Sequence, residues 1–205
     1  MGLLHGVAMR LTLTQAFGAL VLLLAGASLF FTVGVVRFQR GLKAAGAGPA
    51  VVSGASATYV QAVDGDEVSV RIEGQPLTVR LLGISAFDPA IQDPLVQPFG
   101  RAAMQHLDQL AAGRAVTLHF EELAYDRKRR LLAHLHVGSV DAGLELVSRG
   151  LALTYTRYPF GRMGVYLQAE AEARERRAGL WAEAAASTRA TQLRVVWDQE
   201  RARED

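Results

Sequence analysis

Residues 57–84 decide the fold, and they read ATYVQAVDGDEVSVRIEGQPLTVRLLGI. Apolar and polar residues alternate along three segments of this stretch, which is the pattern of half-buried β-strands. The three segments are 57–63, 67–73 and 76–84. Asp64-Gly65 and Glu73-Gly74 stand between them, and such pairs are turn signals between antiparallel strands. The stretch therefore predicts three strands joined by two tight turns.

Two later segments, 115–121 and 131–137, also have strand character, which brings the predicted strands to five. Helical periodicity runs through three further segments, one after the third strand and two near the end of the domain. These segments are 99–112, 141–149 and 163–178. Short strands and helices in this order predict an α+β domain, a five-stranded OB-type β-barrel with three helices.

Length and composition limit the number of domains and the kinds of site that the chain can contain. The chain has 205 residues, which is room for a membrane anchor and one domain of ordinary size. It contains no cysteine, so disulfides and thiolate metal sites are excluded and the fold rests on its hydrophobic core. The formal net charge is only +2, so total charge gives no strong argument for a nucleic-acid partner and does not exclude one.

The N-terminal region is apolar and lacks acidic residues, the first of which is Asp64. No charged residue lies between Leu11 and Val36, and at ~1.5 Å per residue this run is long enough to cross a bilayer core of ~30 Å. We therefore predict that the barrel is preceded by an N-terminal membrane anchor at 1–40, with one transmembrane helix at about 14–36.

A cleaved signal peptide is the alternative, because Ala45-Gly46-Ala47 is similar to a cleavage site. Signal peptides have apolar cores of only ~7–15 residues, and here three basic residues separate the apolar run from that site, which favours the anchor. They are Arg37, Arg40 and Lys43. Because only Arg10 precedes the span, the basic residues favour a domain on the cytoplasmic side of a bacterial plasma membrane or the matrix side of the mitochondrial inner membrane.

The domain boundaries follow from composition. Residues 41–56 are small and without periodicity, which is typical of a flexible linker, and we place the barrel domain at 57–183. Residues 184–205 are predicted to form a C-terminal helical tail with three apolar residues at helical spacing. These are Leu193, Val196 and Trp197. Two interpretations of the tail stay open: it docks on a partner, or it is partly frayed and Trp197 folds back on its own domain.

Six motifs follow one another through the barrel domain. They are VDGDEV (63–68), GQPLTVRLL (74–82), FGRAA (99–103), DRKRRLLA (126–133), ELVSRGLA (145–152) and GLW (179–181). In their order they resemble the staphylococcal nuclease-like (thermonuclease) family, over about 57–183. The resemblance implies an OB-fold barrel with three helices and a calcium-dependent phosphodiesterase that acts on DNA and RNA.

The resemblance also implies roles for single residues. Asp66 stands at the position of the first metal-binding aspartate, and Arg80 and Arg130 stand at those of the two phosphate-binding arginines. In such a site a hard cation polarises the phosphate and two guanidinium groups stabilise the charge of the transition state. Asp88 stands where the family has the carboxylate that orients or deprotonates the attacking water. The implied catalytic residues are therefore Arg80, Asp88 and Arg130.

The loop after the third strand departs from the family pattern. Ser85 replaces an acidic metal ligand, Phe87 replaces a proline and Asp88 replaces a glutamate. The first change removes one negative charge from the metal site, and the last shortens a carboxylate by about 1 Å, a shift that can cost ~10²-fold in rate. We therefore expect vestigial or weak catalytic residues, no bound cofactor, and Ca²⁺ only if the domain is active.

Each retained residue also has a purely structural interpretation. Asp64 and Asp66 can be turn residues, and Arg80 can form an ion pair with Asp66 or Asp88. The basic run 127–130 can contact phosphates or an anionic membrane surface, or it can be a solvated hairpin tip.

Two functional hypotheses follow. In the first, the chain is a membrane-anchored pseudoenzyme with a nuclease fold, which serves as a structural or accessory subunit of a membrane complex. Its partners are then membrane lipid, other subunits of that complex and, through the basic residues, nucleic acid. In the alternative, it is a membrane-anchored calcium-dependent nuclease. The altered positions Ser85 and Asp88 favour the first hypothesis, and the sequence leaves open whether the chain is an enzyme.

Overall fold

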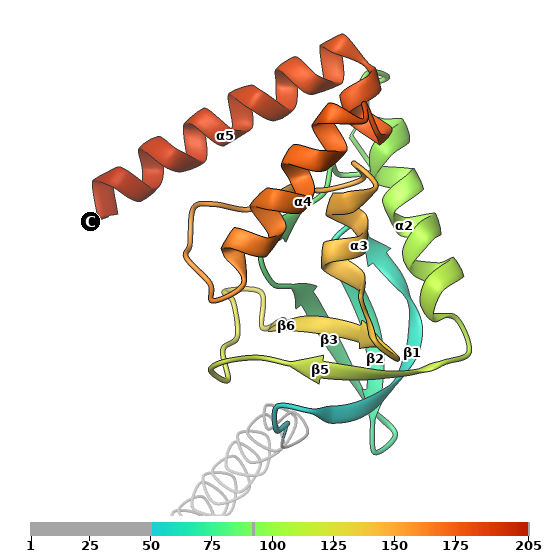
Figure 1. The fold of residues 1–205 in the computed structure, drawn as a ribbon. Helices are drawn as coiled ribbons and strands as arrows, with labels where there is room; N and C mark the ends of the chain where they lie inside the picture. Colours follow the sequence, from blue (N-terminus) through green and yellow to red (C-terminus); the bar gives the residue numbers. More distant parts are fainter. Residues whose placement is uncertain (1–50, 92, 205) are drawn as a thin grey trace, which may run out of the picture. The chain divides into compact units, whose positions relative to one another are not determined.

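The computed structural model describes residues 51–91 and 93–204 (Figure 1). The predicted membrane anchor at 1–40 and residues 41–50 of the predicted linker lie outside this part. Within the part that the structure describes, no helix is both long enough and apolar enough to cross a bilayer. The position of the predicted transmembrane helix therefore stays a prediction.

Five strands form a closed barrel. They are β1 (Ala55–Asp64), β2 (Glu67–Ile72), β3 (Gln75–Leu81), β5 (Ala115–His119) and β6 (Leu131–Val137). Their order is β3-β2-β1-β5-β6, all in antiparallel pairs, and a parallel pairing of β3 with β6 closes the ring. The short strand β7 (Val140–Asp141) extends the sheet beside β6. The predicted five-stranded barrel is confirmed.

Alternation of burial explains why these segments form strands. In β2 the side chains of Val68, Val70 and Ile72 are buried, while the residues between them are half-buried or exposed. Strand β6 departs from this pattern, because Leu131, Ala133, Leu135 and their neighbour His134 are all buried. Two-sided burial of β6 follows from its place between the barrel interior and the helices.

Four α-helices and one short 3-10 helix lie in the described part of the chain. They are α2 (Gln97–Ala111), α3 (Ala142–Ser148), α4 (Met163–Glu175), the 3-10 helix η1 (Gly179–Ala182) and α5 (Ala184–Glu204). The first three correspond to the three predicted helices, and they stand side by side next to the barrel in Figure 1. Asp108 of α2 accepts hydrogen bonds from the Tyr59 hydroxyl at 2.8 Å and from the Ala62 amide at 2.9 Å, which fixes α2 to β1.

The third predicted strand, 76–84, was wrong in its extent. Strand β3 ends at Leu81, and a second, two-residue strand β4 (Ile84–Ser85) pairs with β8 (Leu153–Thr154) in a separate ladder. Gly83 lies between β3 and β4 with φ +80°, a left-handed conformation that glycine adopts without steric cost. The chain therefore turns out of the barrel at Gly83 and brings Ser85 next to the segment that follows α3.

Helix α5 packs on its own domain along one apolar face. Ala186, Ala190 and Trp197 are buried and Leu193 is half-buried, at the spacing of successive helical turns. The Trp197 ring makes an edge contact with Tyr155, with ring centroids 4.9 Å apart. Of the two interpretations of the tail, the structure therefore favours the one in which Trp197 folds back.

Candidate functional site

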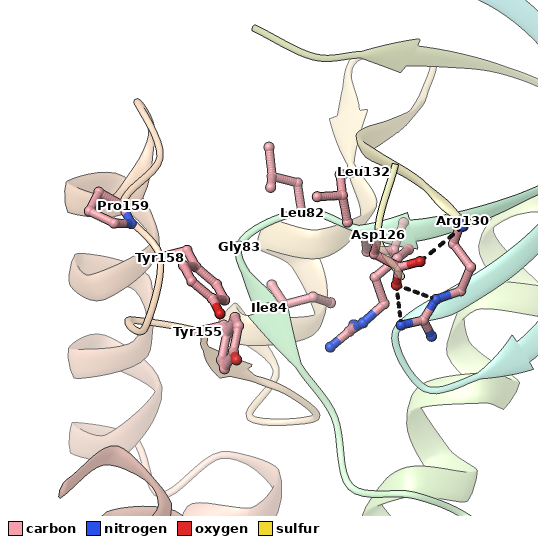
Figure 2. A pocket seen from close by; sticks show the side chains of 11 residues that line it. Leu82, Gly83, Ile84, Asp126, Arg130, Leu132, Tyr155, Tyr158 and Pro159 are labelled. Carbon is pink, nitrogen blue, oxygen red and sulfur yellow. Dashed lines mark hydrogen bonds and ion pairs between the residues drawn. The ribbon is translucent and has the colours of Figure 1, made fainter. Parts of the chain in front are cut away.

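A pocket of about 330 Å³ opens where β3, β4 and β6 meet the segment after β8 (Figure 2). Leucine, isoleucine and tyrosine side chains make up most of its wall, and two arginines and an aspartate provide its charges. The lining residues are Arg80, Leu81, Leu82, Gly83, Ile84, Asp126, Arg130, Leu132, Tyr155, Tyr158 and Pro159. Both predicted phosphate-binding arginines therefore line one cavity.

Arg80 forms an ion pair with Asp66. Asp66 is the second residue of the two-residue turn between β1 and β2, and it is only 5% exposed. Its Oδ1 lies 2.6 Å from Arg80 Nη1, and its Oδ2 accepts a hydrogen bond from the Ala86 amide at 2.8 Å. Arg80 Nη1 also donates to the Asp66 carbonyl oxygen at 3.2 Å. Both carboxylate oxygens of Asp66 are thus engaged by the chain itself.

The burial of Asp66 is costly for its charged form. Burial raises the pKa of Asp66 to about 6, although the Arg80 charge and the Ala86 amide act in the opposite direction. The pKa of the neighbouring Asp64 is also raised, mainly by burial, and the hydrogen bond from the Gly65 amide opposes this shift. The carboxylates at this turn are therefore held in a less hydrated environment than ordinary turn aspartates.

Arg130 is held by two carboxylates. Its Nε donates to Asp126 Oδ2 at 2.7 Å, and its Nη1 contacts Glu67 Oε2. Asp126 Oδ1 also accepts from the Lys128 and Arg130 amides at 2.9 and 3.0 Å, so the loop before β6 folds around this carboxylate. Burial alone would raise the pKa of Asp126, but the hydrogen bonds from Arg130 outweigh it and lower that pKa.

The two altered positions lie apart from the pocket wall. Ser85 is half-buried in β4, where it pairs with Leu153. Asp88 is exposed, and its Oδ1 accepts from the Ala90 amide at 2.7 Å, which makes it the first residue of a local turn. The charge of Asp88 contributes to the raised pKa of Asp64, so Asp88 lies on the same side of the barrel as the turn between β1 and β2. Of the predicted catalytic residues, Arg80 and Arg130 meet at the pocket and Asp88 does not line it.

The described residues do not fit a calcium site. Ca²⁺ takes six to eight oxygen ligands, and a strong site supplies several of them from carboxylates. Within residues 51–91 and 93–204, no group of three or more histidine, aspartate or glutamate side chains is placed to hold a metal ion. Asp66 is the one carboxylate retained at the implied ligand positions, and its two oxygens contact Arg80 and the Ala86 amide.

Sequence reasoning missed three residues of this site. Glu67 contacts Arg130, and Tyr155 and Tyr158 form one wall of the pocket, with ring centroids 6.0 Å apart. The pairing of β2 with β3 sets Glu67 directly opposite Arg80, so the acidic residue after Asp66 was a usable signal. Nothing in the spacing of the tyrosines pointed to the pocket, because their segment reaches it through the β4–β8 ladder.

Residues 78–183 match the family model described as staphylococcal nuclease homologue. This chain belongs to the staphylococcal nuclease family. Two relatives are a thermonuclease of Staphylococcus intermedius, 27% identical over 131 residues, and a probable endonuclease LCL3 of Verticillium alfalfae, 30% identical over 119 residues. The alignments cover 63% and 54% of this chain, and 78% and 41% of the relatives. Protein ParB of Escherichia coli is 31% identical over 138 residues, which are 60% of this chain and 71% of that protein.

The staphylococcal nuclease fold thus positions two guanidinium groups at an apolar pocket with an aromatic wall. Guanidinium groups suit phosphate, because their fork geometry matches two of its oxygens. Tyrosine rings suit nucleobases, which stack on aromatic faces. In this chain, however, the guanidinium groups of Arg80 and Arg130 are already bound to carboxylates.

Proposed function

We propose that this chain is a membrane-anchored member of the staphylococcal nuclease family with an impaired catalytic site, which serves as a structural or accessory subunit of a membrane complex. One observation carries the impairment: the Asp66 carboxylate is bound on one oxygen by Arg80 and on the other by the Ala86 amide. A metal ion would have to share these oxygens with both donors, one of which is positively charged, and Ser85 adds no charge to attract it. The roles proposed for Arg80, Asp88 and Arg130 are therefore vestigial or weak.

The anchor is proposed from the sequence. The uncharged run between Leu11 and Val36 has the length of a transmembrane helix, and the basic residues after it favour a domain on the cytoplasmic or matrix side. The membranes that fit are a bacterial plasma membrane and the mitochondrial inner membrane. Membrane lipid and other subunits of a complex are the proposed partners.

The outer face of α5 supports an accessory role. Val195 and Val196 are 50% and 47% exposed on the helix that Trp197 holds against the domain. Apolar residues on a fixed helix are suited to contact another protein. In this proposal the domain presents α5 to a neighbouring subunit, and nucleic acid is a further ligand only where it displaces the internal ion pairs.

The alternative is a membrane-anchored calcium-dependent nuclease. Two of the relatives carry the names thermonuclease and probable endonuclease, and both arginines implied by the family resemblance are present at the pocket. This alternative requires Asp66 to leave Arg80 when calcium and substrate bind.

Cleavage of single-stranded DNA and RNA by the purified full chain, with calcium and with a chelator, separates the two proposals. We expect no calcium-stimulated cleavage above background. The double variant Ser85→Asp, Asp88→Glu restores the family pattern and is expected to recover part of the activity. If the unmodified chain shows calcium-stimulated cleavage that disappears in Arg80→Ala, the proposal of an impaired catalytic site is refuted. The chain is then a calcium-dependent nuclease.

The anchor has its own test. We expect the full chain to stay in the membrane fraction after extraction at alkaline pH, while a variant without residues 1–40 is released. N-terminal sequencing of the mature chain is the control, since a new N-terminus near residue 48 would refute the anchor in favour of a cleaved signal peptide.

A further inference from the structure

The charge of the pocket does not match that of an open phosphate site. Arg80 and Arg130 provide two positive charges, but Asp66, Glu67 and Asp126 provide three carboxylates that contact them. Only Asp126 of these three lines the pocket, but because all three contact the arginines, the ion-paired cluster as a whole offers a phosphate no net positive charge. A phosphate also has to compete with carboxylates that are already in hydrogen-bond contact with both guanidinium groups.

Among these carboxylates, Glu67 differs from the other two. Asp66 accepts a hydrogen bond from the Ala86 amide, and Asp126 accepts hydrogen bonds from amides of the loop before β6. Both carboxylates therefore stabilise the local backbone. The interaction found for the Glu67 carboxylate is the one with Arg130 Nη1. Glu67 therefore occupies a guanidinium group, and among the hydrogen bonds of the described residues its carboxylate accepts none from a backbone amide.

The position of Glu67 is fixed by the barrel. It is the first residue of β2 and lies directly opposite Arg80 of β3, while β3 pairs with β6, the strand that Arg130 precedes. The side chains of Glu67 and Arg130 are each 16% exposed, so their contact is partly shielded from water and weakly screened. Strand register thus places this carboxylate between the two arginines of the pocket.

We propose that Glu67 is an internal substitute for a phosphate group: its carboxylate occupies Arg130 and keeps the pocket closed to anions, and a nucleotide phosphate binds when that carboxylate is removed or displaced. This inference deepens the proposed function of the same site, and it rests on that proposal only in taking the pocket as a ligand site. The released Arg130 Nη1 and the Arg80 guanidinium then face the phosphate together.

The rest of the wall favours a nucleotide over free phosphate. Tyr155 and Tyr158 face the cavity from one side and Leu82, Ile84 and Leu132 form its apolar surface (Figure 2). The pocket of about 330 Å³ is larger than a phosphate ion needs and has room for a sugar or a base beside it. A base that stacks on a tyrosine ring gains affinity that orthophosphate lacks.

The test compares one buried contact with one matched surface charge. Full-length chains carrying Glu67→Gln or Glu122→Gln are titrated with thymidine 5′-monophosphate and with orthophosphate by isothermal titration calorimetry, next to the unmodified chain. Glu122 is exposed and lines a neighbouring cavity, so its replacement removes the same charge without touching Arg130. The Gln side chain keeps the size of Glu67, and thermal unfolding checks that each variant is folded.

We expect Glu67→Gln to bind the nucleotide at least about tenfold more tightly than the unmodified chain, and Glu122→Gln to change the affinity by no more than about twofold. Adding Arg130→Gln to Glu67→Gln should abolish the gain, and orthophosphate should bind more weakly than the nucleotide. If Glu67→Gln proves unstable, Glu67→Ser carries the same test.

Equal affinities for the Glu67 and Glu122 variants, or a gain that survives Arg130→Gln, would overturn the inference. So would a folded Glu67→Gln chain that binds neither probe. The proposed impairment is judged separately, because calcium-stimulated cleavage by the unmodified chain would refute it whatever the nucleotide affinities are.

Discussion

Two clusters of carboxylates and arginines in this domain look alike as sets of ion pairs but differ in their surroundings. In the first, Glu170 of α4 is 3% exposed and accepts three hydrogen bonds, each of 2.7 Å, from the Thr154 amide, Arg174 and Arg194. These donors belong to β8, α4 and α5, so one carboxylate joins three elements. In the second, Asp66 and Arg80 are paired beside a cavity, and burial raises the pKa of Asp66 to about 6.

The difference separates a structural cluster from a ligand site. Glu170 has each of its oxygens bound to donors of the fold and borders neither of the two cavities described above. The arginines of the pocket cluster line a cavity that a ligand can enter. Ion pairs alone therefore do not identify a functional site. A cavity next to a buried carboxylate with a raised pKa is the more specific indication.

The largest expected effect comes from breaking the structural cluster. Glu170→Ala removes the acceptor of a buried amide and the partner of Arg194, whose side chain is 17% exposed. We expect the free energy of unfolding to fall by about 3 kcal/mol or more, measured by urea denaturation. Glu172→Ala, in the same helix but with a 50% exposed side chain, is the control and should cost less than about 0.5 kcal/mol. Similar losses in both variants would contradict the structural role of Glu170.

A second prediction concerns the packing of α5. Trp197 is 8% exposed and contacts Tyr155, so Trp197→Ala leaves a large void and should lower the free energy of unfolding by about 3 kcal/mol. Limited proteolysis should then cut within α5 before the barrel unfolds. Val196→Ala changes a 47% exposed neighbour and should leave both measurements nearly unchanged. A helix that resists protease in Trp197→Ala would show that α5 is held by its polar contacts instead.

A smaller effect is expected from the pH dependence of the pocket cluster. Burial raises the pKa of Asp66 from 3.8 to about 6, so the folded chain keeps a proton that the unfolded chain loses. The stability contributed by this group is therefore full below pH 3.8 and is lost progressively as the pH rises through about 6.

Asp66→Asn should remove that fall, so the stabilities of the two chains, measured by urea denaturation between pH 4 and 7, should differ in slope. The pKa of Asp64 is raised mainly by burial, and that cause is present in both chains. Parallel pH profiles would show that Asp66 titrates normally in the folded chain.

The barrel could be predicted because its signals are local. Alternation marked β1, β2 and β3, and Asp64-Gly65 and Glu73-Gly74 marked their turns. The extent of β3 could not be predicted, because β4 and β8 are two residues long and too short to have a periodicity. The packed face of α5 was visible as helical spacing, but its docking on Tyr155 depends on contacts far apart in the sequence.

The site was predicted less completely. Motif positions identified Arg80 and Arg130, and both line the pocket. The sequence left the partner of Arg80 open between Asp66 and Asp88, since the choice depends on the local turn that binds Asp88 to the Ala90 amide. The contact of Glu67 with Arg130 was not predicted, because it depends on the strand register that sets Glu67 opposite Arg80.

Calorimetric titration of the full chain with calcium tests whether Asp66 stays paired with Arg80 or binds a metal ion. We expect no binding at calcium concentrations up to about 1 mM, the range of weak protein sites, and the same null result for Asp66→Asn. Binding by the unmodified chain in that range that is lost in Asp66→Asn would show that Asp66 is a metal ligand.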